Sequence, residues 1–131
     1  MYCQAAISWA SRKQKSVALS SCEAEIVAAS DAGKEAVYLQ NLLCELGLGA
    51  MGPIPVSVDN TAARNLAYNP EHHERTKHID RRHFYIRELV EEGRITVPFV
   101  CSADNLADFF TKPLAPAPFT ALRNRIMGYA H

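Results

Sequence analysis

One long helical segment dominates this sequence and limits the folds open to it. It opens with Ser20-Ser21-Cys22-Glu23, a capping box in which a serine hydroxyl accepts a free helix amide and the glutamate reaches back. Apolar residues then recur at steps of three and four up to Leu46, and Gly47 follows as a stop. The pattern predicts a helix from residue 21 to about residue 46. Gly33 inside it predicts a kink or a close packing contact.

Shorter segments flank this helix in an order typical of an α/β fold. Apolar runs predict strands, and periodic runs bounded by glycine or proline predict helices. Pro98 places the last strand at a sheet edge or a bulge. The strands are expected at residues 5–10, 54–59 and 94–100, with a further extended piece at 16–19, and the helices at 61–68, 78–92, 105–111 and 116–127. Alternation of strands with helices indicates an α/β architecture.

Composition excludes several classes of protein. A length of 131 residues suits one domain, and 48% apolar residues exclude wholesale disorder. Fourteen basic residues balance fourteen acidic ones, so any contact with a polyanion must come from a local patch. No apolar run approaches the roughly 20 residues of a membrane span, and residues 1–4 lack the features of a signal peptide. Four widely spaced cysteines indicate reduced thiols in an intracellular protein.

Three acidic residues stand where a metal site would need them. Glu25 lies in the first turns of the long helix, Asp59 ends a strand, and Asp108 lies in the helix after the last strand. Ligands gather at the carboxyl ends of parallel strands, and a right-handed crossover could bring Glu25 near Asp59. Clustered carboxylates suit Mg²⁺ or Mn²⁺, two of which, about 4 Å apart, can clamp a phosphodiester. The alternative is structural, with an aspartate as helix cap and a glutamate facing the helix dipole.

A second cluster is basic. Histidines 72, 73, 78 and 83 lie among Arg75, Lys77, Arg81 and Arg82. Three interpretations stay open: a transition-metal site, a surface that contacts a nucleic-acid backbone, or a solvated helix entry. The loop of Arg12, Lys13 and Lys15 is likewise a backbone contact or a plain hairpin surface.

These segments resemble the copia-type LTR retrotransposon polyproteins. Ile7-Ser8-Trp9 and the run from Lys13 to Glu25 are similar to that family's signature. The similarity continues in collinear order through residues 34–36, 42–47, 58–60, 69–70, 73–80, 83–88 and 105–114. The region resembled is the ribonuclease H region that follows the reverse transcriptase. It implies a ribonuclease H-like fold, a mixed sheet flanked by helices.

The resemblance also implies a function. The family cuts the RNA strand of RNA–DNA hybrids with two divalent metal ions, Mg²⁺ or Mn²⁺, and four carboxylates. By motif, Glu25, Asp59 and Asp108 match three of these catalytic metal ligands, and Glu23 is the capping partner. The fourth, a first-strand aspartate, has no match, since no acidic residue precedes Glu23. We therefore expect residues 1–131 to be a single partial domain that lacks the first two of five strands, with impaired cleavage.

Two alternatives and a set of partners accompany that expectation. The chain is otherwise a non-catalytic nucleic-acid-binding module, or an inactive fragment whose exposed sheet edge needs a partner. Expected partners are the RNA–DNA hybrid, the reverse transcriptase portion of the same polyprotein, and a second copy at the open edge, with no membrane. The expected location is the cytoplasm, a virus-like particle or the nucleus. The residues expected to bind nucleic acid are Arg12, Lys13, Lys15, Arg75, Lys77, His78, Arg81 and Arg82.

Overall fold

The computed structural model describes residues 5–15, 21–48, 52–68 and 77–129. They belong to two compact units, which we describe separately. One unit comprises residues 18–100, and the other comprises residues 1–17 and 101–131. We call them the central unit and the terminal unit.

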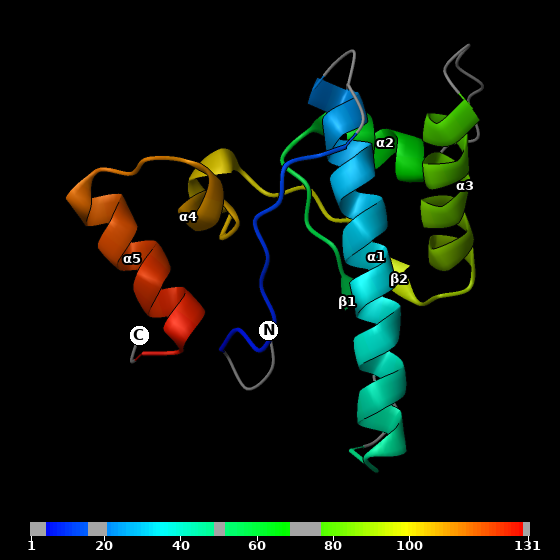
Figure 1. Cartoon of the computed structure of the whole chain (residues 1–131), viewed down its shortest axis with the longest axis horizontal. Helices are drawn as coiled ribbons and strands as arrows, with labels where there is room; N and C mark the ends of the chain where they lie inside the picture. Colours follow the sequence, from blue (N-terminus) through cyan, green and yellow to red (C-terminus); the bar gives the residue numbers. More distant parts are fainter. Residues whose placement is uncertain (1–4, 16–20, 49–51, 69–76, 130–131) are drawn as a thin grey trace. The chain divides into compact units, whose positions relative to one another are not determined.

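The central unit is a helix-rich α/β unit around a small parallel sheet (Figure 1). Its elements are α1 (Ser21–Glu45), β1 (Ile54–Pro55), α2 (Thr61–Tyr68), α3 (Lys77–Glu91) and β2 (Ile95–Thr96). Ile54 pairs with Ile95, and a further parallel bridge joins Val58 to Phe99. The amide of Val56 donates to the carbonyl of Thr96 at 2.7 Å, and the amide of Val58 to that of Pro98 at 3.0 Å. The pairing therefore extends well beyond the two short strands.

The two edges of this sheet differ. On the outer side of β2, the amide of Val97 donates to the Tyr68 hydroxyl at 2.9 Å. A side chain from α2 thus takes the place of a neighbouring strand. On the outer side of β1, the backbone groups of Ser57 point away from β2, because Val56 and Val58 point toward it. Within the described residues, Ser57 has no backbone partner.

Helix α1 packs closely on α3. A Cβ atom placed on Gly33 would lie 3.0 Å from Cδ1 of Leu89 and 3.7 Å from Cε1 of Tyr85. The close packing contact predicted for Gly33 is therefore confirmed. The core around this contact is formed by Ile26, Ala29, Ala36, Val58, Ala63, Ala67, Ile86, Leu89, Ile95 and Val97. These apolar side chains come from all three helices, from β2 and from the segments that follow the two strands, so the helices and the sheet share one core.

Glycines follow two helices of the central unit, α1 and α3, where the sequence predicts. After α1, Gly47 has φ 74°, and after α3, Gly93 has φ 71°. This left-handed conformation suits glycine because it has no Cβ atom. Helix α2 has the predicted bounds, and α3 differs from its prediction by one residue at each end. The capping box depends on Ser20, which lies outside the described residues, as does the extended piece predicted at 16–19.

The terminal unit is helical. A short 3₁₀ helix, η1 (Ser102–Asp104), precedes α4 (Asp108–Thr111) and α5 (Pro116–Met127). Helix α5 has the predicted bounds, begins with a proline and ends at Gly128 with φ 68°. Its buried residues are Leu122 and Ile126. Residues 5–15 join this unit through the amide of Ala6, which donates to the carbonyl of Ile126 at 2.9 Å.

Four predicted segments of secondary structure need correction. Residues 7–9 are irregular and exposed, so the strand predicted at 5–10 is wrong, and Ala6 bonds the end of a helix instead of a strand. The strands predicted at 54–59 and 94–100 are shorter than expected. The helix predicted at 105–111 is limited to α4, because residue 105 is irregular and residues 106–107 form a turn.

The structure also bears on the predicted state of the cysteines and on membrane-spanning helices. Among the described cysteines, Cys22, Cys44 and Cys101 form no disulfide. Among the described helices, none combines the length and apolarity needed to cross a membrane.

Candidate active site

The central unit places Glu25 and Asp59 at the same end. Both α1 and α3 begin there, since Arg82 of α3 donates to Asp31 at 2.9 Å and to the carbonyl of Val27 at 3.5 Å. At the opposite end, the Gln40 side chain donates to the carbonyl of Arg94, just before β2. The strands therefore run antiparallel to α1, and their carboxyl ends lie beside its first turns (Figure 1).

Asp59 directly follows the paired segment that contains Val58 and precedes α2. The side chain of the next residue, Asn60, accepts the amide of Ala63 at 3.1 Å, and its carbonyl accepts the amide of Arg64 at 3.1 Å. This is the hydrogen-bonding pattern of a helix N-cap. The cap of α2 is therefore Asn60, and the structural alternative of a capping role does not account for Asp59, which is half-buried.

Glu25 is also half-buried, one turn into α1. Its neighbour Glu23 is only 5% exposed, consistent with a structural role at the helix start. The fold thus brings two of the three predicted carboxylates to one end of one unit. Carboxylate oxygens are the ligands that Mg²⁺ and Mn²⁺ prefer, so the donor chemistry fits such an ion.

Asp108 belongs to the terminal unit. It is the first residue of α4, is 9% exposed and pairs with Lys112 one turn later, with Nζ 3.1 Å from Oδ2. A buried carboxylate needs such a partner, because an unpaired charge away from water is costly. The Lys112 ammonium thus lies where a metal ion bound by Asp108 would have to lie. Across the described ranges, no three side chains of His, Cys, Asp or Glu form a group able to hold a metal ion.

The predicted nucleic-acid-binding residues are divided between the two units. Arg12, Lys13 and Lys15 are exposed on the segment that joins the terminal unit. In the central unit, Arg81 is exposed, while Arg82 forms an ion pair with Asp31. Lys77 and His78 lie in the first turn of α3, and Arg75 lies outside the described residues. The basic start of α3 therefore lies at the same end of the central unit as Glu25 and Asp59.

Sequence reasoning missed how charge is divided between the units. The terminal unit contains six Lys and Arg residues against two acidic residues, so its net charge is 6 − 2 = +4. The central unit contains eight against twelve, so its net charge is 8 − 12 = −4. The balanced total hides this division. Counting acidic residues by segment would have revealed it, since residues 101–131 contain no glutamate.

The known proteins that this chain resembles include Pol polyproteins of plant transposons. Over 107 residues, 82% of this chain, it is 45% identical to the "Retrovirus-related Pol polyprotein from transposon TNT 1-94" of Nicotiana tabacum. Over 120 residues, 92% of this chain, it is 39% identical to the corresponding polyproteins from transposons RE1 and RE2 of Arabidopsis thaliana. The chain spans about 8% of the length of each relative. No family model and no solved structure matches it.

Proposed function

We propose that this chain, whose homologues are retrovirus-related Pol polyproteins from plant transposons, is the ribonuclease H-like segment of a copia-type polyprotein. Its substrate is the RNA strand of an RNA–DNA hybrid. The observation that carries the proposal is the position of Glu25 and Asp59. They come from α1 and from the carboxyl end of the β1 segment, and both lie at one end of the central unit.

In this proposal, acidic residues bind metal ions and basic residues bind the nucleic-acid backbone. Glu25, Asp59 and Asp108 would hold the divalent ions, which activate the attacking water and stabilise the leaving oxygen when bound. Exposed cations such as Arg81 would bind the backbone of the hybrid without reading its sequence. Lys112 would have to release Asp108 before that carboxylate could bind a metal. Only three of the four family carboxylates are matched here, so we expect little or no cleavage by these 131 residues alone.

Metal binding is the first test. We expect isothermal titration of Mn²⁺ into the chain to show binding that Asp59→Asn and Glu25→Gln each weaken by about tenfold or more. Glu45→Gln is the matched control, because this exposed acid lies at the other end of α1. Equal affinity in all four proteins would reject the proposed site.

Cleavage is the second test. A labelled RNA–DNA hybrid is incubated with the chain and Mg²⁺ or Mn²⁺. Slow cleavage that disappears in Asp59→Asn would support a partial active site. Full turnover that survives Asp59→Asn would show that another site performs the reaction.

A non-catalytic binding module is the second candidate, and the +4 charge of the terminal unit favours it. It predicts that the hybrid binds with an affinity that falls steeply as salt rises, because cations on the protein displace counterions from the phosphates. Binding without cleavage in the metal-loaded chain would select this candidate over the first.

A further inference from the structure

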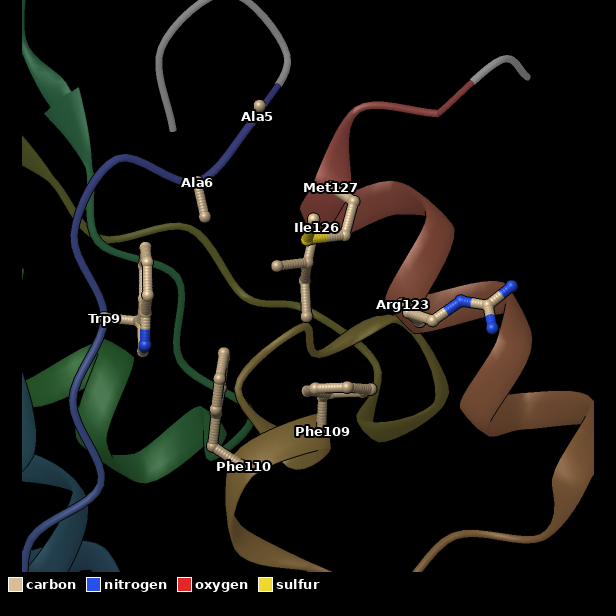
Figure 2. Close-up of a pocket in the computed structure, with 8 residues that line it drawn as sticks. All are labelled: Ala5, Ala6, Trp9, Phe109, Phe110, Arg123, Ile126 and Met127. Carbon is tan, nitrogen blue, oxygen red and sulfur yellow. The ribbon is translucent and has the colours of Figure 1, made fainter.

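The terminal unit contains an aromatic cavity that the proposed active site does not use. Its volume is about 280 Å³, and residues 5–15, α4 and α5 form its walls (Figure 2). The side chains that shape it are Trp9, Phe109, Phe110, Arg123, Ile126 and Met127. One water molecule needs only about 10–15 Å³ on this measure, so the cavity has room for one flat heterocyclic ring.

The aromatic walls are held in place by the unit itself. Phe109 stacks on Phe119, with centroids 4.9 Å apart, and meets Phe110 edge-to-face at 5.2 Å. The hydroxyl of Ser11 donates to the carbonyl of Phe110 at 3.3 Å, which ties the Trp9 segment to α4. Trp9 remains 66% exposed, although exposing a tryptophan to water is costly. Its ring and that of Phe110 border the open space in Figure 2.

The positive charge of the terminal unit indicates which kind of ligand the cavity suits. Arg123 lies at the rim of the cavity, where its Nη2 and Nε donate to Oδ1 of Asn124 at 2.9 and 3.2 Å, and its guanidinium points outward, away from Trp9 and Phe110 (Figure 2). The surrounding unit carries a net charge of +4. An apolar peptide side chain would need the apolar walls but not this excess of cations. A single-stranded nucleic acid needs both, since its bases stack on aromatic rings and its phosphates attract cations.

We propose that this cavity binds an unpaired nucleobase of a single-stranded nucleic acid. One base stacks against Trp9 and Phe110, and Arg123 meets the adjoining phosphate. The site goes beyond the proposed nuclease function, because it requires neither metal nor a hybrid. Its test is therefore independent of whether the carboxylates bind metal.

Trp9 provides the measurement, because it is the single tryptophan of the chain. The full chain is titrated at low salt with a deoxythymidine oligomer of about 12 nucleotides, and tryptophan fluorescence is recorded. We expect saturable quenching. A duplex and an abasic oligomer of the same length should bind at least about tenfold more weakly, since neither offers a free base.

Variants separate the cavity from diffuse charge. Phe110→Ala should weaken binding by about tenfold, and Phe110→Leu by a similar factor while keeping most of the side-chain volume. Arg123→Gln should weaken it severalfold more than Arg125→Gln, which removes the same charge from α5 but lies outside the cavity lining. Circular dichroism establishes that each variant is folded.

Several results would overturn the proposal. These are an absence of quenching, equal quenching by the abasic oligomer, or equal losses in the two arginine variants. A change in Trp9 emission that follows protein concentration without nucleic acid would assign the cavity to a second copy instead.

Discussion

Gly33 sets how closely α1 and α3 can approach. Leu89 of α3 lies where a side chain at position 33 would begin, and Leu89 is only 4% exposed. The leucine is enclosed by other core side chains, so it has little room to move aside. A helix normally loses stability through a central glycine, and here the loss is offset by close packing.

We therefore expect Gly33→Val to lower the free energy of unfolding by about 1–3 kcal/mol through overpacking. The control is Ala32→Val, which enlarges the neighbouring exposed residue and should cost about 0.5 kcal/mol from helix propensity. Urea denaturation followed by circular dichroism measures both. Equal losses would mean that the helices can separate at this point without cost.

Asn60 and Asp59 are adjacent but have different roles. Asn60→Ala removes the N-cap of α2 and should cost about 1 kcal/mol of stability. Asp59→Asn leaves that cap in place and should cost less stability than Asn60→Ala. Thermal unfolding of the two variants checks the contrast. A larger loss in Asp59→Asn would show that this residue has mainly a structural role, which would weaken the metal proposal.

At the scale of elements, hydrogen bonds between Gln40 and Arg94 connect α1 to the start of β2. The Gln40 amide donates to the carbonyl of Arg94 at 3.0 Å and accepts from Nε of Arg94 at 2.9 Å. Arg94 also donates to Asn41 at 3.2 Å. Gln40 and Arg94 are both half-buried, so these hydrogen bonds are partly shielded from water.

We expect Gln40→Leu to cost about 1–2 kcal/mol, because it keeps the bulk of the side chain but removes its two hydrogen bonds with Arg94 and a longer one to the carbonyl of Gly52. Asn41→Ala removes one exposed bond and should cost about 0.5 kcal/mol. Hydrogen exchange at the amide of Ile54, which donates to the same Arg94 carbonyl, gives a local measure. Unchanged exchange in Gln40→Leu would mean that the strands hold their positions without this contact.

The sequence predicted helices better than strands, for a physical reason. Helices α2 and α5 have local signals at both ends, such as Pro70 after one and Gly128 after the other, and their hydrogen bonds are internal. A strand needs a partner distant in sequence. Residues 7–9 have a strand-like sequence, but Ala6 bonds α5, and the alternation of residue types could not reveal that.

The candidate site was also only partly predictable. A strand end followed by a helix correctly indicated the positions of Glu25 and Asp59 at one end of the fold. The pairing of Asp108 with Lys112 follows from their spacing of four residues, since Asp108 begins the single turn of α4 and Lys112 directly follows it. The aromatic cavity could not be predicted, because it combines Trp9 with residues about a hundred positions later.

At the scale of the molecule, the chain has two cores. Ile86 is 2% exposed in the central unit, and Leu122 is 6% exposed in the terminal unit. We expect Leu122→Ala to abolish hydrogen-exchange protection in α5 while α1 and α3 keep theirs, because each core stabilises its own unit. Ile86→Ala should do the reverse, with a loss of about 2–5 kcal/mol in its unit. Loss of protection throughout the chain in both variants would show that the two units unfold together.

The edges of the small sheet determine how copies of the chain could assemble. Tyr68 occupies the outer edge of β2 at Val97, whereas on the outer edge of β1 no backbone group of the described residues pairs with Ser57. Two copies that join at their β1 edges would pair each other's backbone hydrogen-bonding groups and leave no further edge for a third copy. A fibre requires two open edges on every copy. Where copies do join by strand addition, the Tyr68 hydroxyl on the β2 edge favours a closed pair over a fibre.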